Sequence, residues 1–441
     1  MRRTLATLLC SAPFLLTGSV HALEPSPLGT AIDQRAAAVD ARVVEWRRYL
    51  HAHPELSDQE VETSAYVAAR LREMGLTPRT GVARHGVVAV IDGALPGPVV
   101  ALRADMDALP VKEEVDLPFA SHVTSNYEGR SVPVMHACGH DAHTAMLLGV
   151  AEVLSGLRSR LPGKVVLLFQ PAEEGVPADR APAGAELMLH EGVLDEPKVE
   201  AIFGLHVFAG VPTGELLYRS GPMLAAADRF EIVVEGRQAH GSMPWDSIDP
   251  IVTGSEIVTA LQTLVSRRLD LRREPAVVTV GQFESGVRNN IIPDRARLVG
   301  TIRTFDEGMR TQVHADLTRL ATNIAAAHGA TAKVTIEPGY PVTVNDPALA
   351  ARMRPTLERV APGHVGENLK IMAAEDFSFF ARHVPGLFLD LGVTPAADVK
   401  GAASNHSPRF FVDEAALPTG VRALAHLAAD YLSGANAATR K

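Results

Sequence analysis

Short apolar runs alternate with segments of helical composition in the first half of the chain. Such runs are typical of buried strands. They fall at Val87–Ile91, Val99–Leu102, Lys164–Gln170 and Ala201–Val207. Helices are predicted over Val61–Met74 and over Thr144–Leu157, the second of which is apolar nearly all round. Ser57 and Glu60 have the spacing of a capping box for the first helix. Alternating strands and helices predict an α/β domain with a mixed, largely parallel sheet and flanking helices.

A different pattern begins near Gly221 and ends before Gly339. Its elements follow the order β-α-β-β-α-β, which is the order of a ferredoxin-like module. They are expected at Arg229–Glu235, Pro250–Arg267, Ala276–Ser285, Arg295–Thr304, Met309–His328 and Ala332–Glu337. Helix-strand alternation then resumes and ends with a helix near Glu414–Leu432. We therefore expect an inserted domain over residues 223–337, within a main domain formed by residues 23–222 and 338–441.

The first residues have the pattern of a secretory signal. Arg2 and Arg3 precede an apolar run over Leu5–Leu16, and a small-residue cleavage motif ends at Ala22. We expect residues 1–22 to be a signal peptide and the mature protein to be periplasmic or secreted; an uncleaved anchor is the alternative. No later segment approaches about 18 consecutive apolar residues, so no membrane insertion of the mature chain is expected.

Charge and cysteine content narrow the possible partners and chemistry. The formal charge of -9 and the lack of a basic run argue against nucleic acid or anionic lipid as a partner. Removal of the signal would leave Cys138 as the only cysteine, which excludes an internal disulfide. Cys138 lies in the segment Met135–His143, which also holds three histidines and an aspartate. These side chains are typical metal ligands, but one segment cannot complete a site.

Other segments offer ligands near the ends of predicted strands, where open α/β sheets place their sites. Glu173 and Glu174 can share a site only if the chain turns, since adjacent strand side chains point to opposite faces. A solvated acidic loop is the alternative for this pair. His206 ends an apolar strand and could be an ordinary core histidine. Asp107 ends a buried strand, where a carboxylate needs partners, and His406 lies in a polar loop that by itself would be an ordinary turn.

Eight short motifs resemble one known family. They are Arg-Ala-Asp-Met-Asp-Ala-Leu-Pro at 103–110, Met-His-Ala-Cys-Gly-His-Asp at 135–141, Gln-Pro-Ala-Glu-Glu-Gly at 170–175, Gly-Leu-His at 204–206, Ala-His-Gly-Ser at 239–242, Asn-Ile-Ile-Pro-Asp at 290–294, Ala-Glu-Asp-Phe at 374–377 and Asn-His-Ser-Pro at 405–408. Together they resemble the co-catalytic metallopeptidase and aminoacylase family. The likeness is strongest to its branch of hippurate hydrolases, N-acyl-amino-acid amidohydrolases and hydrolases of auxin (IAA-amino acid) conjugates. The resemblance implies a zinc-peptidase-like catalytic domain, with the inserted domain as a lid and as the interface of a homodimer.

The resemblance also implies a centre of two divalent metal ions per subunit, zinc or manganese, with cobalt or nickel as alternatives. The implied ligands are Cys138, His140, Glu174, His206 and His406, with Cys138 shared by both ions. Glu173 corresponds to the general base that takes a proton from a metal-bridging water and returns it to the leaving amine. Asp107 is expected to orient a ligand imidazole. His136, Asp141 and His143 are expected to have supporting roles.

In the lid, the resemblance implies that His240 stabilises the developing oxyanion, in its own site or in that of the partner subunit. Asn290 and Arg303 are implied as donors to a substrate carboxylate, which Arg303 can bind in bidentate fashion. We therefore predict a metal-dependent amidohydrolase or metallocarboxypeptidase that cleaves the amide bond of N-acyl or aryl-acyl amino acids or small peptides. The alternatives are an amidase with Cys138 as nucleophile and a periplasmic two-domain solute-binding protein.

Overall fold

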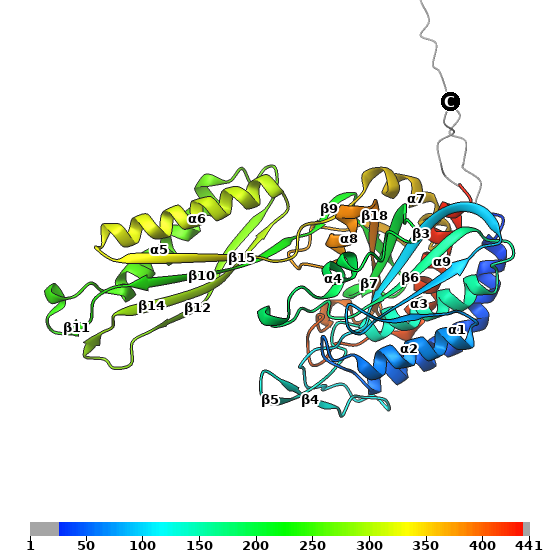
Figure 1. Ribbon diagram of the computed structural model, residues 1–441, viewed down its shortest axis with the longest axis horizontal. Helices are drawn as coiled ribbons and strands as arrows, with labels where there is room; N and C mark the ends of the chain where they lie inside the picture. The colour runs from blue at the N-terminus through cyan, green and yellow to red at the C-terminus, as the bar shows by residue number, and fades with distance from the viewer. Residues whose placement is uncertain (1–25, 435–441) are drawn as a thin grey trace, which may run out of the picture.

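The computed structural model describes residues 26–434, so the predicted signal peptide and its cleavage site near Ala22 lie outside the described residues. The chain forms two lobes, one built around a large sheet and the other elongated and joined to the first at one end (Figure 1). Within residues 26–434, the structure contains no helix that is long and apolar enough to cross a membrane.

The larger lobe contains an eight-stranded sheet with the order β1-β2-β6-β3-β7-β18-β8-β17. Its strands are β1 (Arg79–Val82), β2 (Gly86–Asp92), β3 (Leu95–Asp105), β6 (Pro162–Gln170), β7 (Ala201–Pro212), β8 (Leu216–Tyr218), β17 (Val365–Glu367) and β18 (Gly386–Thr394). The central pairs β6–β3, β3–β7 and β7–β18 are parallel, whereas β1–β2, β2–β6 and β18–β8 are antiparallel. The predicted mixed, largely parallel sheet is therefore confirmed.

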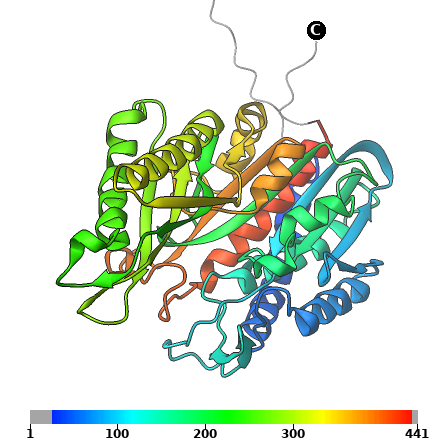
Figure 2. The ribbon, with the colours of Figure 1, turned by 60° about the vertical axis from the view of Figure 1, so that its left-hand side comes forward.

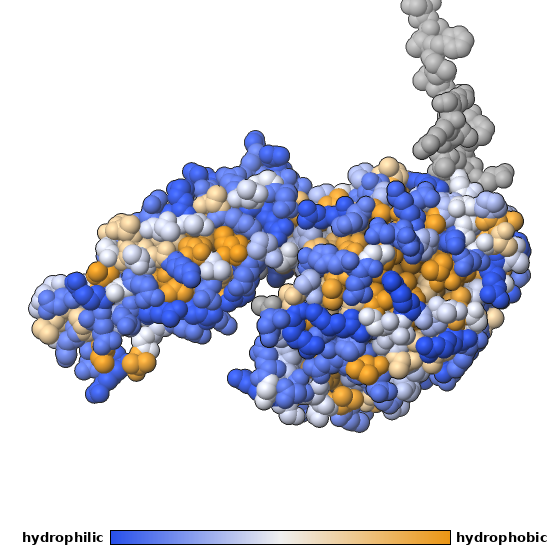
Figure 3. Space-filling model, in the orientation of Figure 1, coloured by the Kyte–Doolittle hydropathy of each residue, from blue (hydrophilic) through white to orange (hydrophobic). Residues whose placement is uncertain are grey.

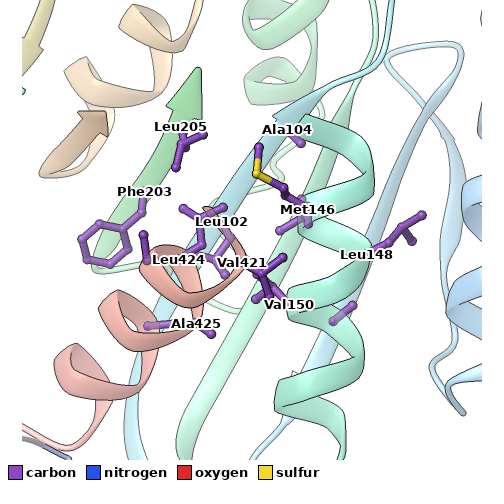
Figure 4. Close-up of a cluster of buried hydrophobic side chains, with 14 of the residues drawn as sticks. Leu102, Ala104, Met146, Leu148, Val150, Phe203, Leu205, Val421, Leu424 and Ala425 are labelled. Atoms are coloured by element: carbon purple, nitrogen blue, oxygen red, sulfur yellow. The ribbon is translucent and has the colours of Figure 1, made fainter. Parts of the chain in front are cut away.

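Helices cover both faces of this sheet, because its central strands are apolar on both sides. The helices are α1 (Gly29–Ala52), α2 (Val61–Glu73), α3 (His140–Ser155), α7 (Pro347–Val360) and α9 (Leu417–Leu432) on one face, and α4 (Gly184–His190) and α8 (Phe377–His383) on the other. In β3, Leu102 packs in the first core and the adjacent Ala101 in the second, as the alternation of strand side chains requires. Figure 4 shows Met146 of α3 and Val421 of α9 close to β3 in the first core.

Two features of this lobe differ from the sequence pattern. Helix α1, which packs beside α3 and α9 (Figure 2), was not predicted. Its buried side chains, among them Val39 and Val43, have helical spacing, but alanines and charged residues between them weaken the signal. The predicted capping box is wrong, since the Ser57 hydroxyl donates to Asp107 at 2.7 Å. The backbone N–H groups at the start of α2 are instead bonded to the Glu55 carboxylate.

The elongated lobe has the β-α-β-β-α-β order that the sequence predicted. Its elements are β10 (Ala226–Glu235), α5 (Pro250–Thr263), β12 (Ala276–Ser285), β14 (Arg295–Thr304), α6 (Glu307–Ala327) and β15 (Thr331–Pro338). They form an antiparallel sheet, β12-β14-β10-β15, with a separate core in which Phe230 of β10 packs with Leu261 of α5 and Leu317 of α6. Strands β9 (Gly221–Leu224) and β16 (Thr343–Asn345) pair where the chain enters and leaves this lobe.

Candidate metal centre

The predicted site residues of the larger lobe gather at one edge of the sheet. Asp107 follows β3, Glu173 and Glu174 follow β6, and His206 lies in β7. These three strands are parallel, so residues near their carboxyl ends meet at the same edge. The turn that begins α3 supplies His140, with Cys138 two residues before it.

Gly139 allows the Cys138 turn to approach the sheet. It lies between the two candidate ligands and has a left-handed φ of 92°. A Cβ at this position would lie 2.3 Å from Cγ2 of Val207, the neighbour of His206. Glycine is therefore required here both for the backbone conformation and for the close approach.

The loop that carries His406 is held by backbone contacts to the same turn. Asn405 Nδ2 donates to the carbonyl oxygens of Cys138 at 3.2 Å and of Val207 at 3.1 Å. The His406 N–H donates to the carbonyl of Ala137 at 2.8 Å. These bonds bring His406 to Cys138 although the two are 268 positions apart in the chain. Asn405 was not predicted as a site residue, although it lies directly before a candidate ligand in the chain.

Cys138 lies at the centre of the candidate ligands. Its Sγ is 3.3 Å from His206 Nε2 and 3.2 Å from His406 Nε2. Two groups of ligand atoms share this sulfur, and within each group the atoms lie within 4.8 Å of one another. The groups are Cys138, His140 and His206, and Cys138, Glu174 and His406. The structure thus offers two adjacent donor sets joined by one sulfur atom.

The hydrogen bonds of these side chains leave the lone pairs free that a metal ion requires. His140 Nδ1 lies 3.1 Å from Asp107 Oδ1, and His206 Nδ1 donates to the carbonyl of Val207 at 2.7 Å. In both rings Nε2 is therefore free to act as a ligand. His140 Nε2 is buried and lacks a hydrogen-bond partner among residues 26–434, and Glu174 Oε1 is buried with only His406 Nε2 of the other candidate ligands beside it, at 3.1 Å. Since buried polar atoms are rarely left unpaired, these atoms and the soft sulfur fit a divalent metal centre.

Glu173 and Glu174 lie in a turn, because β6 ends before them. Ala172 and Gly175, on either side, have positive φ values of 53° and 90°. Both glutamates line one pocket together with Cys138, His206 and His406, so they do not form a solvated acidic loop. The Glu173 carboxyl is buried, and its pKa is raised well above the usual value, first by burial and then by the negative charge of Glu375.

Arg103 neutralises a cluster of buried carboxylates next to this pocket. Its Nε donates to Gln170 Oε1 at 2.8 Å, and its Nη1 to Asp105 Oδ2 at 2.6 Å. Its Nη2 donates to Glu375 Oε1 and Asp376 Oδ1, both at 2.8 Å. Burial raises the pKa of Asp376 to about 8, even though the charge of Arg103 opposes this shift. Arg103 was not predicted as a site residue; its position as a charged residue in a buried strand was the signal that could have revealed it.

His143 and Asp105 also lie within ligand distance of His140, but their polar atoms are already bonded. His143 Nδ1 lies 2.5 Å from Asp105 Oδ1, and His143 Nε2 accepts the N–H of Val207 at 2.8 Å. The other Asp105 oxygen accepts from Arg103. Both ring nitrogens of His143 are therefore occupied, and each Asp105 oxygen already has a buried partner.

Asp141 and His136, two further polar residues of the 135–143 segment, belong to neither donor set. Asp141 Oδ2 is 2.8 Å from Arg47 Nε and 2.9 Å from His51 Nδ1, so it ties the first turn of α3 to α1. His136 is buried, and its ring nitrogens have no hydrogen-bond partner within residues 26–434. Burial lowers the pKa of His136 to about 4, which keeps the ring neutral.

Arg303 is the predicted lid residue that reaches this pocket. The pocket has a volume of about 360 Å³ and is lined by Cys138, Glu173, Glu174, His206 and His406 from the larger lobe and by Arg303 of β14. Burial lowers the pKa of the Arg303 guanidinium, which nevertheless remains a cation at neutral pH.

His240 and Asn290 do not line the pocket. His240 lies in β11 (Ala239–His240), which pairs with β13 (Ile291–Ile292), and the Gly241 N–H donates to the carbonyl of Asn290 at 2.8 Å. Figure 1 shows β11 at the end of the elongated lobe farthest from the large sheet. His240 is exposed, and its Nδ1 accepts the N–H of Ser242 at 3.1 Å, so Nε2 carries the proton and is free to donate.

Comparison with known proteins identifies the family. Residues 101–430 match the family model described as peptidase family M20/M25/M40. The chain belongs to this family. An IAA-amino acid hydrolase of Arabidopsis thaliana, ILR1-like 2, is 40% identical over 88% of this chain and 85% of its own length. Thermostable carboxypeptidase 1 of Saccharolobus solfataricus is 40% identical over 88% of this chain and 95% of its own.

A solved structure extends the comparison to metal binding. The YXEP protein of Bacillus subtilis, described as a dinuclear metal binding peptidase from the M20 family, superimposes with a TM-score of 0.75 and 36% identity. The match covers 90% of this chain and 99% of that one. The predicted family and hydrolase class are therefore confirmed. The chain is an M20-family amidohydrolase or peptidase with candidate groups of metal ligands.

Proposed function

We propose that this hydrolase cleaves the amide bond of N-acyl or aryl-acyl amino acids, or of small peptides with a free carboxylate, with two divalent ions as cofactors. The observation that carries the proposal is the position of Cys138 Sγ between two donor sets, with Glu173 beside them. Glu173 is in the same pocket but is not needed to complete either set that contains Cys138. Its carboxylate can therefore accept and donate a proton during the reaction.

Two ions held by Cys138, His140, Glu174, His206 and His406 would polarise the scissile carbonyl and make an attacking water more acidic. The protein's own groups would then move the proton. Glu173 takes a proton from the water and later delivers it to the amide nitrogen as the C–N bond breaks. The Tyr340 hydroxyl donates to the Glu173 backbone carbonyl at 2.6 Å and thereby supports the turn that positions this carboxylate.

The substrate class follows from Arg303 and from the relatives. A guanidinium at the wall of the pocket matches a carboxylate, which it can bind through two N–H groups. The two named relatives are a hydrolase of IAA-amino acids and a carboxypeptidase. Amino-acid conjugates and peptides share an amide bond next to a free carboxylate. We propose the same arrangement for the substrate of this chain, with zinc or manganese as the metal.

We further propose that His240 and Asn290 act in the site of a second subunit. Strand β11 with His240 lies at the far end of the elongated lobe, Asn290 is hydrogen-bonded to Gly241 beside it, and neither residue lines the pocket of its own chain. Exposed apolar side chains accompany them, since Trp245 is 74% and Val287 is 97% exposed. Figure 3 shows hydrophobic residues on this end of the lobe. A homodimer would cover such residues and would bring the Nε2 donor of His240 to a partner's substrate. We also propose export to the periplasm or medium, from the signal pattern of the first residues.

The first test compares metal-free and reconstituted protein. Hydrolysis of N-acetyl, N-benzoyl and indole-acetyl amino acids should disappear with chelation and return when zinc or manganese is added. Glu173→Gln should keep its metal content and lose about 10²- to 10⁴-fold in kcat, as expected for a general base. Glu62→Gln, on an exposed position of α2, is the matched control and should behave as wild type.

The second test separates a ligand role of Cys138 from a nucleophilic role. Cys138→Asp keeps an anionic side chain that can contact two ions, so it should retain measurable metal binding and metal-dependent turnover. If Cys138 were the nucleophile, the Cys138→Asp variant would lose all activity and the wild type would remain active without metal. Either result would contradict the two-metal proposal.

A further inference from the structure

The pocket that holds the candidate ligands also contains a carboxyl group that the proposed reaction does not use. Asp390 of β18 lines this pocket and is 1% exposed. The neighbouring walls are apolar and include Phe208, Leu224 and Phe388. In the sheet, Asp390 pairs in register with His206 of β7, so both side chains project from the same face. An acid is thus placed deep in a largely apolar wall close to the reaction centre.

Asp390 differs in its partners from Glu174 and Glu375, two other acids of the pocket. Glu375 accepts from the Arg103 guanidinium, and Glu174 Oε1 lies 3.1 Å from His406 Nε2. The Asp390 carboxyl is hydrogen-bonded to the neutral side chain of Asn368, and within residues 26–434 the structure records no cation against it. Burial raises the pKa of Asp390 to about 8, because the Asn368 bond only partly offsets the loss of water. Burial of an acid with so few partners reduces the stability of the protein unless another group forms a hydrogen bond with it.

Arg303 and Asp390 line this pocket from the two different lobes of the protein. Arg303 comes from β14 of the elongated lobe and Asp390 from β18 of the large sheet. In an N-acyl amino acid, the carboxylate and the side chain leave the same Cα. If Arg303 binds the carboxylate, the side chain of the same amino acid enters the space between Arg303 and the sheet, which Asp390 borders.

We propose that Asp390 is a specificity residue that selects amino acids whose side chain ends in a hydrogen-bond donor, with an ammonium group as the best fit. This inference rests on the proposed hydrolysis of N-acyl amino acids. The donor would form a hydrogen bond with the Asp390 carboxyl, while Phe208 and Phe388 would pack against the methylene groups of the same substrate side chain. A site built to bond a donor rejects an apolar isostere, because the buried carboxyl is then left without that partner.

A purely structural role is the main competing explanation. The bond between Asn368 and Asp390 ties the residue after β17 to β18, and it could serve only to hold this edge of the sheet. A structural role predicts that substitution changes stability or turnover equally for all substrates. A specificity role predicts a change in the ratio between two substrates that differ at one atom.

The test uses the metal-loaded protein with N-acetyl-L-ornithine and N-acetyl-L-norleucine, whose side chains have the same length and end in an ammonium or a methyl group. We expect wild type to favour ornithine in kcat/KM by about 10- to 100-fold, the range of a hydrogen bond to a charged group. Asp390→Asn keeps the shape and should reduce this ratio to near one, and Asp390→Leu should reverse it. Asn368→Ala leaves the carboxyl in place and should keep the ornithine preference.

Each remaining outcome overturns the proposal in a recognisable way. A wild-type ratio near one, or a ratio that Asp390→Asn leaves unchanged, means that Asp390 does not select the side chain. Equal losses for both substrates in that variant mean a structural role. If wild type hydrolyses neither these substrates nor N-acetyl-L-leucine after metal loading, the proposed function itself has failed.

Discussion

The substitution Asp107→Asn tests how the protein orients its candidate metal ligands. Asp107 is fully buried and contacts both donor sets. Its Oδ1 lies 3.1 Å from His140 Nδ1, while its Oδ2 accepts the Glu174 N–H at 2.9 Å and the Ser57 hydroxyl at 2.7 Å. These bonds lower the pKa of Asp107 against the effect of burial, with His140 as the largest of them, so the carboxylate is the form present.

An asparagine cannot reproduce this pattern. Its carbonyl oxygen can accept from only one side, and if that side is His140, its amide nitrogen faces the N–H of Glu174. Two donors then meet and a buried N–H is left unpaired, which costs about 1–3 kcal/mol. Loss of a residue that orients a ligand imidazole typically reduces metal affinity 10- to 100-fold. This range corresponds to about 1.4–2.7 kcal/mol of binding free energy.

The assay is a competition for zinc and for manganese between the protein and a fluorescent chelator, together with thermal unfolding of the metal-free protein. We expect 10- to 100-fold weaker metal binding and a lower melting temperature without metal. Asp92→Asn is the matched control, since Asp92 is exposed and, within residues 26–434, forms an ion pair with Lys164 alone, at 2.6 Å. A folded Asp107→Asn variant with wild-type affinity for both metals would refute the orienting role.

Three further predictions concern stability, pH and assembly. Arg103→Met should lower the free energy of unfolding, measured with urea, by about 3–5 kcal/mol, because it leaves buried carboxylates without their cation. An unchanged urea midpoint would contradict this. Asp228→Asn should destabilise the protein at neutral pH, since hydrogen bonds led by that from Arg310 lower the Asp228 pKa despite burial. This stabilisation is fully present above the pKa that Asp228 has in the unfolded chain, and it is lost as the pH falls through the lower pKa of the folded state. The free energies of unfolding of wild type and variant should therefore converge as the pH falls below about 4, and a constant difference would refute this. Finally, His240→Ala and Glu173→Gln chains, each inactive alone, should recover about a quarter of wild-type activity when mixed and reassembled as dimers, whereas action of His240 within its own chain predicts no recovery.

The fold was predictable where periodicity is strong and contacts are local. The strands Ala276–Ser285 and Arg295–Thr304 have the same bounds in the sequence prediction and in the structure, because closely spaced apolar residues mark both. Helix α1 was missed, since its apolar positions are separated by many alanines and charged residues. Ser57 was assigned to a helix cap although its hydroxyl bonds Asp107. Its true partner lies 50 positions away, beyond the reach of a local pattern.

The candidate site shows the same division. Cys138 and His140 were recognisable as candidate metal ligands by type, and the resemblance carried by the motifs added Glu174, His206 and His406 as further candidates. Asn405 and Asp390 were not recognised, because their roles depend on contacts with Cys138 and on the walls of a pocket. A single asparagine or aspartate in a loop or strand carries no local signal of such a role.

The sequence by itself therefore determined the donor chemistry, the order of the elements and the family. These properties are carried by residue types and by periodicity along neighbouring positions. The tertiary structure alone decided that Cys138 Sγ lies between His206 and His406, and which ring nitrogens remain free. It also decided that Arg303 shares their pocket while His240 does not. Such contacts join residues up to 268 positions apart, and the packing of whole strands, helices and lobes sets them.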